Sequence, residues 1–158
     1  MIFRGLSLNE AGLSGFTHIG IVTTEDLTQS TLAAAQTLTL APINAGDEIL
    51  RVFWRLRAPF QVTTDTGFNS DTISVGDSAS ITTYLTAAEA NLNGAYVTYR
   101  ASNTAVLYTA NDNILVTVNS MAGKALVNLN RGELHLFFGI ARIKAVSDSV
   151  PLPKYNKP

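Results

Sequence analysis

Hydrophobic and polar residues alternate with a period of two along most of this chain, a pattern typical of β-strands that bury one face. The clearest example spans positions 49–57. A second runs from Asn113 to Asn119, and a third, from Glu133 to Arg142, places His135 and Phe137 opposite the apolar face. In the first segment one face is expected in the core: Leu50, Val52, Trp54 and Leu56.

Weaker alternation predicts further strands, so that eight to ten are expected in all. They fall at 17–24, 37–40, 61–64, 72–75, 95–100, 105–109 and 125–129. Turn-forming segments rich in Gly, Asn and Asp separate these runs, for example Asn44 to Asp47 and Asp65 to Asn69. Many short strands at this spacing predict an all-β fold, a β-sandwich of jelly-roll type.

Helical signals are few. Thr86 stands three residues before Glu89, which is capping-box spacing and predicts a short helical turn over Thr86 to Leu92. The alanines of Ser30 to Gln36 favour another, although the Thr-Leu alternation that follows indicates entry into a strand. Neither turn would change the fold class.

The two ends of the chain differ from the middle. Residues 1–16 contain three glycines and no persistent period, and we expect an N-terminal arm there. Residues 147–158 contain three prolines, which exclude a central strand and predict an extended C-terminal tail. The expected organisation is an arm at 1–16, a β-sandwich domain at 17–146 and a Pro-rich tail at 147–158.

Composition narrows the possible partners. Eleven basic residues nearly balance twelve acidic ones, so no overall field attracts nucleic acid. Polar residues interrupt every apolar run well before the roughly 18 residues of a spanning helix, and no basic, apolar leader begins the chain. We therefore expect neither nucleic acid nor a membrane as a partner, and synthesis in the cytoplasm.

Candidate chemistry is sparse. The chain has no cysteine, and its two histidines, His18 and His135, stand alone in separate strand patterns, which favours structural or surface roles. Asp65, Asn69 and Asp71 lie close together, but their spacing is not that of a calcium loop and a capped turn is the better interpretation. We expect no enzyme, no metal and no cofactor.

One strand face combines charge with an aromatic ring. Arg51, Phe53, Arg55 and Arg57 alternate within positions 49–57, and the same face is expected to include Ile49. One interpretation is a solvated sheet face on which arginine stems shield the phenylalanine. The other is a protein interface, because Arg and aromatic residues are enriched in such patches.

An Ala-Gly turn at Ala45-Gly46 leads into a strand, and Val75-Gly76-Asp77 precedes the pair Tyr84-Leu85. These turns resemble those of small virion proteins of tailed bacteriophages. The stretch Tyr108 to Ile114 and the closing strand from Gly132 to Leu134 are also similar, so the resemblance covers roughly residues 38–143. The absence of repeats and of coiled-coil heptads is a departure from long fibres.

The resemblance implies a non-enzymatic capsid decoration, or cement, protein. Such a protein is expected to be a homo-oligomer that binds the major capsid protein on the capsid exterior of the virion and stabilises the shell. Two alternatives stay open. One is an accessory protein of the tail or head fibres. The other is a carbohydrate-binding β-sandwich module, whose aromatic platforms would come from this set: Trp54, Tyr84, Tyr96, Tyr99 and Tyr108.

Overall fold

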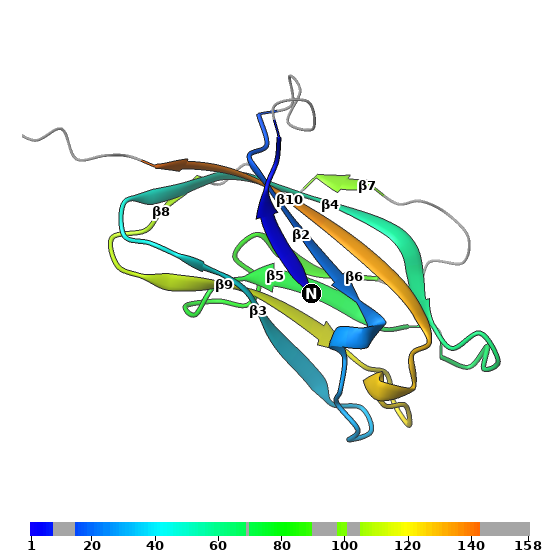
Figure 1. The fold of residues 1–158 in the computed structure, drawn as a ribbon. Coiled ribbons are helices and arrows are strands. Elements are labelled where there is room, and N and C mark those ends of the chain that lie inside the picture. The colour runs from blue at the N-terminus through cyan, green and yellow to red at the C-terminus, as the bar shows by residue number, and fades with distance from the viewer. Residues whose placement is uncertain (8–14, 69, 90–97, 101–104, 143–158) are drawn as a thin grey trace, which may run out of the picture.

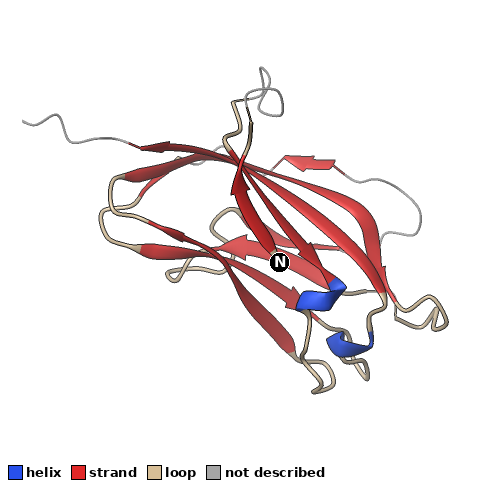
Figure 2. Ribbon diagram, in the orientation of Figure 1, coloured by secondary structure: helices blue, strands red, loops and turns tan. Residues whose placement is uncertain are grey.

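The computed structural model describes residues 1–7, 15–68, 70–89, 98–100 and 105–142. Over these residues the chain forms two antiparallel sheets that lie face to face, seen nearly edge-on in Figure 1. Apart from two short 3₁₀ turns, Thr24–Asp26 and Leu126–Asn128, the regular elements described are strands (Figure 2). The predicted all-β sandwich is confirmed. Its jelly-roll connectivity stays a prediction.

The larger sheet has the order β1-β2-β10-β4-β7, and β8 also pairs with β4. The smaller sheet has the order β3-β9-β5-β6. The larger sheet is built from β1 (Ile2–Gly5), β2 (His18–Thr23), β10 (Arg131–Arg142), β4 (Asp47–Gln61), β7 (Thr98–Arg100) and β8 (Val106–Leu107). The smaller sheet is built from β3 (Ala35–Ile43), β9 (Asp112–Asn119), β5 (Thr72–Gly76) and β6 (Leu85–Glu89).

The core fills the space between the sheets with the inward residues of both, as alternation requires. Trp54 is fully buried, as expected. The largest side chains that are completely enclosed are Trp54, Phe60, Phe68, Phe138, Ile49, Leu56, Ile73, Ile114, Leu126, Leu134, Leu136 and Val22.

A β-bulge in β4 corrects the predicted face of this strand. Gly139 pairs with Arg51 and Ile140 with Ile49, so Leu50 has no partner on β10. The extra residue reverses the alternation on its N-terminal side. As a result Ile49 is buried, whereas Leu50 is 39% exposed, and the predicted positions of these two residues are wrong.

Four local predictions are also wrong. Residues 61–64 form no separate strand, because β4 runs to Gln61 and turns follow. Residues 125–129 form a 3₁₀ turn instead of a strand. The helical turn expected from Thr86 is the strand β6 as far as Glu89. Residues 30–36 contain a turn with Ala33 at a φ of 59°, and β3 already begins at Ala35.

The first strand differs from the prediction of a separate N-terminal arm. Ile2–Gly5, assigned to that arm, forms β1 and pairs with β2 from Ile2↔Ile21 to Gly5↔His18. The predicted tail, residues 147–158, lies outside the described residues.

Candidate docking surface

The arginine-bearing face of β4 lies on the outer side of the larger sheet, turned away from the smaller sheet. Arg51 and Phe53 are half-buried there, and Arg55 is exposed. Arg57 is also exposed, at a second bulge: Leu134 pairs with Leu56 and Glu133 with Ala58, so Arg57 is passed over. The structure therefore places the four predicted residues along one exposed side of β4.

The neighbouring strand adds aromatic rings to this face. The register of β10 sets Phe137 opposite Phe53 and His135 opposite Arg55. The rings of Phe16, Phe53 and Phe137 meet with centroids 5.8 to 6.1 Å apart and tilted planes, which is the geometry that aromatic pairs prefer. We call Phe16, Phe53 and Phe137 the aromatic patch.

A glycine on β10 makes room for Phe16. A Cβ atom at Gly139 would lie 2.8 Å from the carbonyl oxygen of Gly15 and 2.9 Å from Cγ of Arg51, closer than real Cβ contacts. Because position 139 has no side chain, the segment carrying Gly15 lies directly on the sheet. Gly15 itself has a φ of +71°, a conformation that favours glycine.

Two polar contacts border the aromatic patch. The guanidinium carbon of Arg51 lies 5.6 Å from the centroid of the Phe16 ring, a cation–π arrangement. On the other side, Nε2 of His135 lies 2.6 Å from Oε1 of Glu133, and the His135 ring meets Phe137 edge-on. The patch is thus an apolar surface with the Arg51 guanidinium at one side and the His135–Glu133 pair at the other.

The outer face of the larger sheet also carries apolar and arginine side chains on β2 and β1. The strand register aligns Phe137 with Ile19, which is only 6% exposed, and then with Arg4, and aligns His135 with Ile21 and then with Ile2. A surface of aromatic, aliphatic and arginine side chains is chemically suited to binding another protein.

Sequence reasoning identified half of this surface. It placed Arg51, Phe53, Arg55 and Arg57 on one face, which the structure shows. It also placed His135 and Phe137 outward on their strand, but it gave them no role because the pairing of β4 with β10 was unknown. Phe16 was missed, since no periodicity surrounds it.

The aromatic residues proposed as sugar platforms lie mostly in the core. Trp54 is fully buried, Tyr84 is 3% exposed and Tyr108 is 7% exposed. Tyr96 lies outside the described residues, and the side chain of Tyr99 is not described. Three of the five candidates therefore cannot stack on a sugar at the surface.

The remaining sequence candidates are structural. A carboxylate oxygen of Asp65 accepts a hydrogen bond from the Gly67 N–H at 2.9 Å, so the predicted capped turn is confirmed, and Lys124 forms an ion pair with the same side chain. Asp71 is fully buried, and Asn69 lies outside the described residues. Within the described ranges no three His, Cys, Asp or Glu side chains gather as metal ligands. No helix there is long and apolar enough to cross a membrane.

Three of the residues that carry the phage resemblance, Asp77, Tyr84 and Tyr108, meet in one buried network. The Tyr108 hydroxyl donates to Oδ2 of Asp77 at 2.9 Å, and the hydroxyls of Tyr108 and Tyr84 are hydrogen-bonded to each other. Burial raises the pKa of Tyr84 to about 12 and that of Tyr108 still further. At Gly76, a Cβ atom would lie 1.9 Å from the Ser80 carbonyl oxygen, so the turn tolerates only glycine. These motif residues stabilise the fold.

Comparison with known proteins gives structural relatives only. No family model matches the chain, and no curated protein is significantly similar to it. A chain of the cyanophage Pam1 capsid asymmetric unit is similar over 80% of this chain and 82% of that chain, with a TM-score of 0.57 and 19% identity. A chain of the acid-stable capsid structure of Helicobacter pylori bacteriophage KHP30 aligns over 80% and 92%, with a TM-score of 0.46 and 14% identity. The first match shows a shared fold.

Proposed function

We propose that this protein is a non-enzymatic structural component of a phage virion, a decoration protein that binds the outer surface of the capsid and stabilises it. The observation that carries the proposal is the outer face of the larger sheet, where the aromatic patch stands among Arg51, Arg55 and Arg57. The similar fold in a phage capsid and the virion-protein motifs support a capsid protein as the class of partner.

The size of the structural relative supports decoration. The alignment covers nearly equal shares of the two chains, 80% and 82%, so the chains have nearly the same length. The match therefore spans most of both chains. A single small sandwich suits a protein added to a shell that other subunits build.

The proposed mechanism is interface chemistry. The aromatic patch is a preformed apolar anchor, because packing and Gly139 already hold its rings in place, so binding loses little side-chain entropy. Binding through the arginines requires an acidic region on the major capsid protein. The opposite charges would guide the approach of the two proteins and fix their relative orientation. A ligand that binds only the assembled shell stabilises it by about 2.7 kcal/mol per site at a free concentration of a hundred times Kd.

Decoration of particles assembled without this protein tests the proposal. Arg55→Glu and Arg57→Glu should each weaken binding at least tenfold and make it less sensitive to salt. Lys124→Glu is the matched control, since it changes the net charge equally but lies in the turn after β9, where it pairs with Asp65. Equal binding of all three variants and the parent would refute the assignment of this surface.

Particle composition separates the proposal from its alternative. Mass spectrometry of purified particles should find the protein in tailless capsids at a stoichiometry comparable to that of capsomers. Recovery only with isolated tails or fibres would show instead that the protein is a tail or head-fibre accessory.

A further inference from the structure

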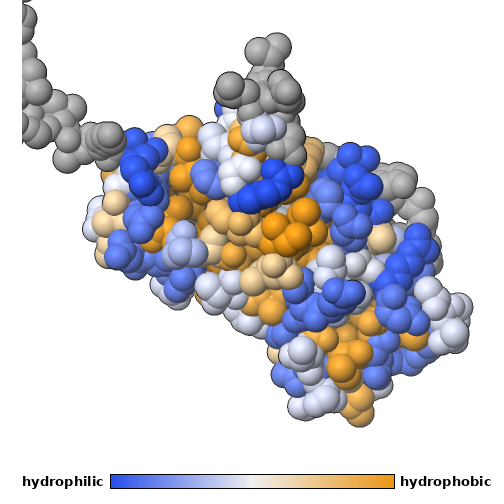
Figure 3. Space-filling model, viewed as in Figure 1, coloured by the Kyte–Doolittle hydropathy of each residue, from blue (hydrophilic) through white to orange (hydrophobic). Residues whose placement is uncertain are grey.

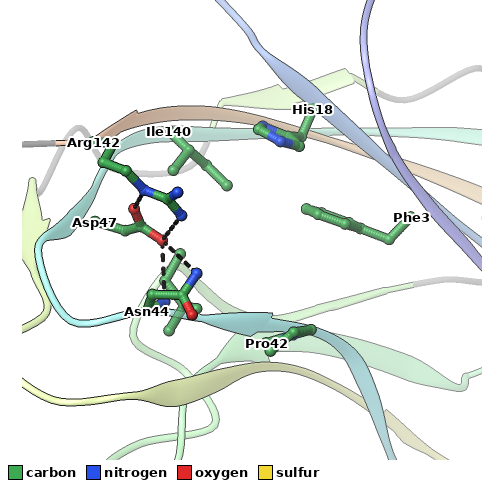
Figure 4. Close-up of a pocket in the computed structure, with 8 residues that line it drawn as sticks. Phe3, His18, Pro42, Asn44, Asp47, Ile140 and Arg142 are labelled. Atoms are coloured by element: carbon green, nitrogen blue, oxygen red, sulfur yellow. Dashed lines mark hydrogen bonds and ion pairs between the residues drawn. The ribbon is translucent and has the colours of Figure 1, made fainter.

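A second candidate surface is a cleft on the open side of the sandwich, between the edge strands β1 and β3 (Figure 4). Its volume is about 330 Å³, within the range of sites that bind small groups or short segments. The side chains that matter here are Phe3, His18, Pro42, Ile43, Ile140 and Arg142. The cleft does not overlap the aromatic patch, because Phe16, Phe53 and Phe137 are not among its lining residues.

The walls of the cleft are apolar and partly aromatic. Phe3 stacks on the ring of His18, with centroids 5.3 Å apart and planes 8° from parallel. Burial lowers the pKa of His18, partly opposed by the charge of Asp47, which favours the neutral imidazole. Hydrophobic atoms gather in this region of the surface, around β1 and above the smaller sheet (Figure 3).

The polar end of the cleft is already neutralised. Nε and Nη2 of Arg142 donate to the carboxylate of Asp47 at 2.7 and 3.2 Å, and the backbone and side-chain nitrogens of Asn44 donate to it at 3.0 and 3.3 Å. These contacts, that of Arg142 above all, lower the pKa of Asp47 to about 2. With one carboxylate paired to one guanidinium, the cleft carries no net charge and suits an uncharged apolar occupant.

We propose that this cleft binds Val150-Pro151-Leu152-Pro153 from the C-terminal tail of a neighbouring copy of this chain. The segment is uncharged and offers two aliphatic side chains. Its prolines restrict it to extended conformations and remove backbone N–H donors that an apolar cleft would leave unsatisfied. Proline-rich segments bind aromatic-lined grooves by this chemistry.

The direction of β10 indicates that the tail comes from another copy. The strand passes the Phe3–His18 stack at Phe138, which pairs with His18, and leaves the cleft at Arg142. The first residues of turn-forming type after Arg142 are Ser147 and Asp148. A chain that reversed there would return level with Arg142 only at about positions 152 to 154, so Val150 to Pro153 would lie at or beyond the Arg142 end of the cleft and would not reach the stack.

The length of the tail allows the contact between copies. Sixteen residues follow Arg142, and an extended chain of that length spans up to about 50 Å. A reciprocal exchange of tails would give a twofold dimer, and a one-way exchange would give a ring. This inference rests on the cleft and not on the proposed capsid role, so either can fail without the other.

Complementation between two full-length variants tests the proposal. Pro42→Glu places a charge at an exposed position of the cleft, and Leu152→Asp places one in the tail. The control Val127→Glu alters an exposed apolar residue at the opposite end of the smaller sheet, beyond the end of β9 that pairs with Ala35. Sedimentation velocity at tens of micromolar gives the oligomeric state, and thermal unfolding confirms that each variant is folded.

The parent and Val127→Glu should self-associate, whereas Pro42→Glu and Leu152→Asp alone should each raise the dissociation constant at least tenfold. An equimolar mixture of the two weakened variants should recover association, because one intact cleft meets one intact tail. The proposal is overturned if the parent is monomeric, if either variant associates as the parent does, or if the mixture recovers nothing.

Discussion

The hydrogen-bonded pair of buried tyrosines gives a sharp prediction about stability. Asp77 is 5% exposed and lies in the turn after β5. Its Oδ1 accepts from the N–H groups of Ala79 and Ser80 at 3.0 and 2.9 Å and from the Thr83 hydroxyl at 3.1 Å. Its Oδ2 accepts from the hydroxyl of Tyr108.

The two tyrosines should therefore differ when each hydroxyl is removed. Tyr108→Phe deletes a hydrogen bond to a charged group, worth about 1.5–3 kcal/mol, and also the neutral bond to Tyr84, worth about 1 kcal/mol. Tyr84→Phe deletes only the neutral bond and leaves Asp77 with its donor. We expect a loss of about 3 kcal/mol for Tyr108→Phe and about 1 kcal/mol for Tyr84→Phe.

Urea titration at pH 7 measures both values, and an unchanged m-value would show that the denatured state is comparable in the two variants. The ring volume is kept in both substitutions, so cavity formation does not enter. A loss for Tyr84→Phe equal to or larger than that for Tyr108→Phe would refute the proposed order of donors, in which Tyr108 bridges Tyr84 and Asp77.

Four further outcomes are expected. Trp54→Ala should cost about 3–5 kcal/mol in a denaturant titration, because the ring is fully enclosed, and a loss below about 1 kcal/mol would contradict its core position. The folded-state pKa of Asp47, about 2, lies below the ordinary 3.8. The ionised carboxylate therefore contributes about 2 kcal/mol to the free energy of unfolding above pH 3.8, and this contribution is lost as the pH falls towards 2. Arg142→Gln should remove most of that contribution at pH 7. The free energy of unfolding of this variant should therefore fall less steeply as the pH is lowered from 3.8 towards 2. Gly139→Val should cost about 1–3 kcal/mol through overpacking against Gly15 and should weaken capsid binding, and normal binding would show that the position of Phe16 is unimportant.

The strands that sequence predicted well are those with one strict buried face. Asn113 to Asn119 became β9, Asp112–Asn119, because its partners bury every second side chain without interruption. The same alternation gave the wrong face for Leu50, because a bulge shifts the alternation of inward and outward side chains by one residue. The position of a bulge depends on the partner strand. Thr86 had helical capping spacing, but pairing of β6 with β5 overrode that local preference.

The run 125–129 is buried with a spacing that differs from that of a strand. Leu126 and Leu129 are buried, while Val127 between them is 48% exposed. Burial at a spacing of three is typical of a 3₁₀ turn and not of a strand.

The candidate docking surface was less accessible to sequence reasoning. Phe53 and Phe137 could each be placed outward, but their contact depends on the register of two strands far apart in the chain.

A cryo-electron microscopy map of the native particle tests the central claim most directly. The account predicts density for this sandwich on the outside of the shell, with Phe16, Phe53 and Phe137 against the major capsid protein and acidic side chains opposite Arg55 and Arg57. A map in which the protein is absent from the shell, or contacts it only through the smaller sheet, would contradict the account.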